Sequence, residues 1–240
     1  MLQSINDLNG FTIHAEGREI GTVEDLYFDD IHWTIRYLVV DTGNWLTGRR
    51  VLISPRSLEG VDWQARIISV RLTCEQVENS PDVAIDKPVS RQHEEELSAY
   101  YGWPSYWTGD PFGVELMVSP VPVAAVERPA RKGDPHLRSA RKVKGYHIEA
   151  LDGPVGHILD FVLNDVTWEI AFMIVDAGPW LYERSVLLKP EWVEGISWDE
   201  RHVAVKLTRE TVKTSPLFLP VFPISSEYIE QLMEHYRQTG

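Results

Sequence analysis

The sequence has one cysteine, a shortage of basic residues and no long apolar run, and each shortage excludes a class of protein. Cys74 alone cannot form an intrachain disulfide, which favours a reducing, cytoplasmic location. Lysine and arginine number 23 against 36 acidic residues, and the net charge of −13 repels phosphate backbones, so we expect no direct nucleic-acid binding. No apolar run approaches about 20 residues and the N-terminus has no signal-peptide pattern, so we expect no membrane insertion.

What the chain does contain is one stretch that occurs twice. The first copy, GTVEDLYFDDIHWTIRYLVVDTGNWL, begins at Gly21, and the second, GHILDFVLNDVTWEIAFMIVDAGPWL, begins at Gly156. The offset of about 135 residues holds without a gap beyond this stretch, and about 25 of roughly 61 aligned residues from position 21 to 81 are identical. Two copies predict two domains, each large enough for a modest core.

Apolar residues alternate with a period of two in the clearest predicted strand of each copy, at 33–41 and 168–176. Trp33 and Trp168 begin these faces, so we expect both to be buried. Five or six short strands in each copy, separated by close turns, indicate a small β-barrel. Because the hydrophobic registers match, residues 10–80 and 145–215 should superimpose.

Short helices are expected after each set of strands, the longer ones at 91–101 and at the C-terminus. The fold class is therefore mainly β with short helices: two tandem small β-barrels, each followed by C-terminal helices. We expect residues 1–105 to form the first unit with its closing helix, residues 106–142 a linker, and residues 143–240 the second unit with its closing helix. The linker ends in basic residues, which we expect to lie against acidic barrel surface.

The duplicated polar residues offer little chemistry. No histidine of one copy is aligned with a histidine of the other, which excludes a duplicated imidazole site, although a site in one copy alone stays open. The aligned carboxylates could serve acid–base chemistry or a cation site; we favour turn caps with ion pairs to Arg49/Arg184 and Arg66/Arg201. We therefore expect no catalytic residue, no cofactor and no metal. The aligned carboxylates are Asp25/Asp160, Asp30/Asp165, Asp41/Asp176, Glu59/Glu194, Glu75/Glu210 and Glu95/Glu230.

One apolar pair in each copy stands where core residues are not expected. Trp45–Leu46 and Trp180–Leu181 both follow a glycine in a predicted turn. Each pair could be an exposed anchor for a protein partner or for the other barrel, or each tryptophan could plug its own barrel. We take these four residues as candidate protein-interaction residues, and we expect at least one pair to contact the other barrel, the linker or a second chain.

Several of these residues carry a family resemblance. The run from Gly21 through RYLVVDTG to VLISP, with Asp30 and Trp33, resembles the PRC-barrel domain. That domain forms the cytoplasmic barrel of the photosynthetic reaction-centre H subunit and the C-terminal half of the ribosome maturation factor RimM. The helix SRQHEEELSAYYGWP and the segment GDPHLRS are similar to a tandem-PRC subfamily of bacterial proteins. The chain lacks the membrane helix of the H subunit and the N-terminal domain of RimM.

This resemblance implies a non-catalytic adaptor or scaffold that binds protein, in association with a photosynthetic or electron-transport membrane complex. A ribosome-assembly or RNA-processing factor that acts through a ribosomal protein is the first alternative, and an enzyme or cation-binding protein is the second. The partner is expected to be a protein of unknown identity, and the duplicated surface also allows a homo-oligomer.

Overall fold

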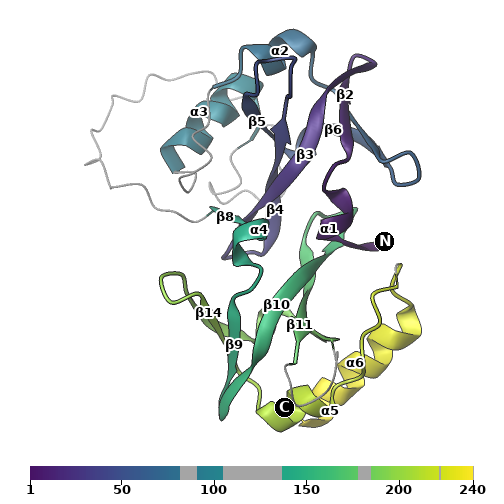
Figure 1. Ribbon diagram of the computed structural model, residues 1–240, viewed down its shortest axis with the longest axis vertical. Coiled ribbons are helices and arrows are strands. Elements are labelled where there is room, and N and C mark those ends of the chain that lie inside the picture. Colours follow the sequence, from purple (N-terminus) through teal and green to yellow (C-terminus); the bar gives the residue numbers. More distant parts are fainter. Residues whose placement is uncertain (82–90, 105–136, 178–184, 222, 240) are drawn as a thin grey trace, which may run out of the picture.

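Two seven-stranded sheets dominate the computed structural model, and six strands of each come from one half of the chain (Figure 1). The structure describes residues 1–81, 91–104, 137–177, 185–221 and 223–239. Six strands of the first sheet come from the first half of the chain and are arranged in the order β5-β4-β3-β2-β7-β6. They are β2 (Thr12–Ala15), β3 (Arg18–Asp29), β4 (Thr34–Asp41), β5 (Arg50–Ile53), β6 (Leu58–Asp62) and β7 (Ile67–Val70).

The second sheet repeats this order as β12-β11-β10-β9-β14-β13. Its ladders also repeat the register: Thr22 lies opposite Asp41 in the first sheet, and His157 lies opposite Asp176 in the second. A β-bulge interrupts each of these ladders at the same aligned position, before Asp25 and before Asp160. The strands are β9 (His147–Ala150), β10 (Gly153–Asn164), β11 (Ile170–Asp176), β12 (Ser185–Leu188), β13 (Val193–Ser197) and β14 (His202–Val205).

Short helices follow both sets of strands. The Thr73 side chain accepts from the Gln76 N–H and the Gln76 side chain accepts from the Thr73 N–H, a capping box that starts the first of them. The expected helix at 91–101 is present, and it buries Leu97. The helical elements are η1 (Pro55–Ser57), α2 (Cys74–Glu78), α3 (Arg91–Tyr101), η2 (Pro190–Trp192), α5 (Arg209–Thr214) and α6 (Ser226–Thr239).

The seventh strand of each sheet comes from the opposite half of the chain. Strand β1 (Leu2–Ser4) pairs antiparallel with β10, and β8 (Leu137–Ser139) pairs antiparallel with β3. A short helix follows each strand, α1 (Ile5–Leu8) and α4 (Ala140–Val143). We call residues 2–8 the first arm and residues 137–143 the second arm. Each unit therefore contributes an arm to the sheet of the other.

The second arm corrects the expected domain boundaries. Residues 137–142 were assigned to the linker, but they form β8 and most of α4. Their counterparts at an offset of about 135 residues are β1 and α1, so the duplication begins at the first arm rather than at Gly10. Three-residue strands are too short to show alternation, and for this reason the sequence pattern did not reveal them.

The units also meet at Trp33 and Trp168, which are buried as expected, with 8% and 9% of their surface exposed. Both have positive φ, 53° and 61°, and both strands begin later than predicted: β4 starts one residue later, at Thr34, and β11 starts two residues later, at Ile170. The Ile35 N–H donates to the Trp168 carbonyl, and the Ile170 N–H donates to the Trp33 carbonyl, each over 2.7 Å. One hydrophobic core cluster consequently contains residues of both units.

Candidate functional site

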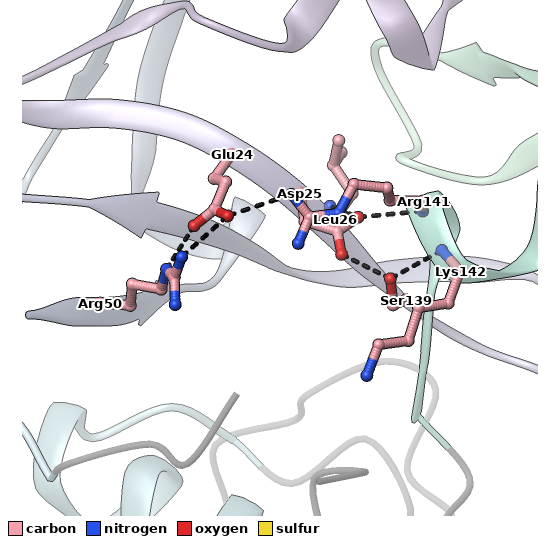
Figure 2. A network of polar contacts seen from close by, with 7 residues as sticks. All are labelled: Glu24, Asp25, Leu26, Arg50, Ser139, Arg141 and Lys142. Carbon is pink, nitrogen blue, oxygen red and sulfur yellow. Dashed lines mark hydrogen bonds and ion pairs between the residues drawn. The ribbon is translucent and has the colours of Figure 1, made fainter. Parts of the chain in front are cut away.

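Figure 2 shows how the second arm docks on β3. The Ser139 hydroxyl donates to Asp25 Oδ2 and accepts from the Lys142 N–H at 3.0 Å, which caps α4. Asp25 Oδ1 accepts from the backbone N–H groups of Arg141 (3.1 Å) and Leu26 (2.8 Å). Asp25 is only 3% exposed, and these donors replace the water that its carboxylate loses.

The first arm makes the equivalent contacts on β10. The Ser4 hydroxyl donates to Asp160 Oδ2 and accepts from the Asn6 N–H at 3.0 Å. The Asn6 N–H also lies 3.4 Å from Asp160 Oδ2, and Lys144 Nζ lies 3.1 Å from Asp160 Oδ1. Asp160 is 5% exposed. In both units, then, a buried aspartate in mid-strand binds a serine that the other unit supplies.

A groove of about 710 Å³ lies between the two units. The turn at Asp30–Trp33 forms one wall, and β11, η2 and β13 of the second unit form the others. Glu169, Glu191 and Glu194 line it beside Asp30. Among the described residues that line it, Lys189 is the one lysine or arginine, and it pairs with Glu191 at 3.0 Å. The groove is therefore acidic and best suited to a basic segment.

The corresponding groove, with the roles of the units interchanged, has a volume of only about 290 Å³. Here the turn at Val166–Trp168 faces β4 and η1, and Trp103 forms part of the lining. Trp103 stacks on Tyr101, with ring centroids 4.3 Å apart, and its indole N–H donates to Ser57 Oγ at 2.8 Å. The chain thus supplies its own aromatic residue to this smaller groove.

Trp45 lies in the turn that connects β4 to β5, and 38% of its surface is exposed. The turn is held by its backbone: the Trp45 N–H donates to the Thr42 carbonyl, and Thr42 Oγ1 donates to the Arg49 carbonyl. Leu46 beside it is partly exposed. This exposure does not fit a tryptophan that plugs its own barrel. Trp180 and Leu181 lie outside the described residues.

A second apolar surface lies on the segment between α5 and α6. Leu217, Leu219 and Val221 are between 47% and 69% exposed, whereas Phe218 between them is buried. The Phe218 N–H donates to the Ser185 carbonyl at the start of β12, which fixes this alternation of inward and outward side chains. These three side chains form an exposed apolar strip.

Residues 3–76 match the family model of the PRC-barrel domain. The chain contains a PRC-barrel domain. The match begins inside the first arm and ends inside α2, so the PRC-barrel sequence includes a strand that is hydrogen-bonded to the other half of this chain. No curated protein matches the chain.

The prediction was wrong for the aligned carboxylates Asp25 and Asp160. We expected turn caps with ion pairs to arginine, but both stand within strands and bind the arms. Arg49 and Arg66 instead donate to backbone carbonyls, those of Glu78 and Asn9. The sequence does contain a signal for these contacts: both arms have a leucine two residues before a serine, LQS and LRS, at the same offset of the duplication. Asp41 does cap its turn, accepting from the Gly43 N–H.

The basic residues at the end of the expected linker lie against acidic side chains, as predicted, where the structure describes them. Arg138 pairs with Asp30 at 3.1 Å, and Arg141 pairs with Glu24 at 3.0 Å. Glu24 also accepts from Arg50 at the start of β5, two strands away in the sheet (Figure 2). Of the other basic residues of this stretch, Lys142 is exposed, and Arg128, Arg131 and Lys132 lie outside the described residues.

One PRC-barrel carboxylate has a lowered pKa. Burial, the largest effect, raises the pKa of Asp29, but hydrogen bonds from His32, Arg36 and the Ile31 N–H together outweigh burial and lower it. Asp29 is also 1% exposed, and its aligned residue Asn164 accepts backbone N–H groups in the same way. Asp29 therefore serves as a turn cap and as an ion-pair partner of Arg36.

Within the described parts of the chain, no group of three or more histidine, cysteine, aspartate or glutamate side chains could hold a metal ion. The helices described there also include none that is long and apolar enough to cross a membrane. Burial, followed by a hydrogen bond with Glu16, raises the pKa of the Cys74 thiol. A raised pKa leaves less thiolate at neutral pH and makes Cys74 a poor nucleophile.

Proposed function

We propose that this chain is a non-catalytic adaptor that binds protein partners through two PRC-type units. A PRC-barrel domain is a protein-interaction module, and residues 3–76 match its family model. The second unit, with the strand order and register of the first, supports the proposal that residues 137–215 are a further PRC-type unit. Two units in one chain offer two separate surfaces, as an adaptor requires.

The observation that carries this proposal is the exposure of Trp45. An exposed tryptophan and its leucine neighbour occupy a turn whose backbone is fixed by hydrogen bonds. Binding a partner therefore does not require the backbone of this turn to be ordered first, which reduces the entropy cost of binding. Tryptophan is the residue type most enriched among side chains that dominate protein-binding energy. The aligned Trp180 and Leu181 extend the same proposal to the second unit.

By analogy with the PRC-barrel family, the partner we propose is a photosynthetic or electron-transport membrane complex, approached from the cytoplasm. The net charge of −13 and the acidic groove beside Asp30 support a partner surface that carries basic residues. A ribosomal protein partner is the alternative, and it predicts a different copurifying assembly.

Affinity purification from the native host tests the proposal, with the wild-type chain and with the double variant Trp45→Ser, Trp180→Ser. We expect the wild type to copurify with a membrane complex and the variant to lose at least about 2 kcal/mol of binding energy. Val166→Ser, which removes another exposed turn side chain, is the matched control and should retain the partner.

Three outcomes would count against parts of the proposal. Co-sedimentation with the small ribosomal subunit would replace the membrane complex with the ribosomal alternative. A double variant that retains its partner would remove Trp45 and Trp180 from the binding surface. A variant that loses thermal stability without losing the partner would show that the tryptophans stabilise their own units.

A further inference from the structure

The two arms share a sequence rule. They read LQSINDL and LRSARKV, so each has leucine two residues before a serine and apolar residues one and four residues after it. The apolar positions after the serine are Ile5 and Leu8 in the first arm and Ala140 and Val143 in the second, and all four are at most 1% exposed. Because two different segments share this pattern, we take it as the sequence pattern that is needed to pair with this edge of β3 or β10.

The accepting edges are equivalent as well. Gln3 lies opposite Leu163 on β10, and Arg138 lies opposite Phe28 on β3, so both arms add an antiparallel strand at the same level of the sheet. In each case the serine then turns the chain into one helical turn, with its hydroxyl on the buried aspartate. This is strand addition with a specific side-chain contact, the mode by which extended peptides join a sheet edge.

Charge distinguishes the two edges. The β3 edge presents Glu24 and Asp30 to the basic second arm. The residue of β10 aligned with Glu24 is Leu159, and the first arm is not basic. On the β3 edge, Gln3 and Asn6 of the first arm would replace Arg138 and Arg141. The ion pairs with Asp30 and Glu24 would then be lost. The first arm is therefore selective for the β10 edge.

The residues that the first arm contacts on β10 are distant in the sequence, and Ser4 and Asp160 are 156 positions apart. The arm is joined to β2 through Gly10, which is exposed and has a φ of 76°, and whose N–H donates to the Val23 carbonyl of its own unit at 2.8 Å. No contact between this arm and β10 depends on the two belonging to one molecule.

We propose that the β10 edge is a docking site for the first arm of a second copy of this chain. Reciprocal exchange would preserve the ladder between β1 and β10 and the hydrogen bond from Ser4 to Asp160, and it would link two copies of the chain. This inference goes beyond the proposed adaptor function and does not depend on it. The chain's own arm competes for the β10 edge with the arm of another copy, at an effective concentration of about 1 mM. The fraction of exchanged arms should therefore increase as the protein concentration approaches that value.

Disulfide trapping tests the exchange. Leu2 and Asn164 are opposite partners in the ladder, so we place Leu2→Cys in one copy and Asn164→Cys in another, both with Cys74→Ser. After the two are mixed at about 1 mM with oxidised glutathione, we expect about tenfold more mixed disulfide dimer than with Leu2→Cys and Gln64→Cys. Gln64 is an exposed turn residue and reports random collision.

The double variant with Leu2→Cys and Asn164→Cys in one chain is the positive control. It should form an intrachain disulfide and lose the concentration-dependent dimer, because its arm is locked in place. If it forms that disulfide while the mixture gives no more dimer than the Gln64→Cys control, arm exchange is refuted. If the double variant stays reduced, the arm does not lie on β10, which overturns the inference as well.

Discussion

Replacing Ser4 with alanine separates the role of the arm from that of the rest of the fold. The change removes the hydroxyl that donates to the buried Asp160 carboxylate and that accepts from the Asn6 N–H. It leaves the backbone ladder between β1 and β10 intact. Asp160 keeps Lys144 as an ion-pair partner, so its charge is not left wholly uncompensated.

The magnitude follows from these two losses. A hydrogen bond to a buried charged group contributes about 1.5–3 kcal/mol. Loss of a helix N-cap costs about 1 kcal/mol. We therefore expect Ser4→Ala to lower the free energy of unfolding by about 3 kcal/mol. Ser54 is the matched control: it is buried and caps η1 through the Arg56 N–H, and its replacement by alanine should cost only about 1 kcal/mol.

Urea unfolding of Ser4→Ala, Asp160→Asn and the double variant measures the coupling directly. We expect the two changes to be non-additive by about 1.5 kcal/mol, because each removes the same hydrogen bond. Ser139→Ala, at the aligned position in the second arm, should cost as much as Ser4→Ala. The reasoning is refuted if Ser4→Ala costs no more than Ser54→Ala, or if the two changes are additive.

Three further changes test other parts of the structure. Trp33→Ala should cost about 3–5 kcal/mol in denaturant titration, and a loss below about 1 kcal/mol would contradict its burial between the units. Asp29→Asn should destabilise the protein at neutral pH and flatten the loss of stability below about pH 4. The reason is that a carboxyl group whose pKa is lowered by folding stabilises the folded state at pH values above its pKa in the unfolded chain. Urea unfolding as a function of pH measures this, and an unchanged profile would contradict it. A Cβ at Gly156 would lie 1.7 Å from the Asp176 carbonyl oxygen, so Gly156→Ala should cost about 3 kcal/mol or more, measured by thermal unfolding. Gly195→Ala is the control and should be nearly neutral, because a Cβ there would have no atom within 4 Å. Equal effects of the two changes would refute the steric argument.

Sequence reasoning succeeded where the pattern is local and repeated. Alternation over β4 and β11 was long enough to place the apolar faces, and the gapless offset fixed the equivalence of the ladders. The capped helix after Thr73 and the helix at 91–101 followed from short-range signals. The exposure of Trp45 was left open, because a turn sequence does not say whether its apolar residue faces the core or solvent.

The sequence by itself determined two similar β-rich units, their strand registers and the absence of a paired histidine site. Only the tertiary structure decided that each unit completes the sheet of the other, and that Asp25 and Asp160 are buried beneath the exchanged serines. The physical reason is that a three-residue strand carries no periodicity of its own. Its place is set by hydrogen bonds and packing against residues more than a hundred positions away, a pairing that no local pattern encodes.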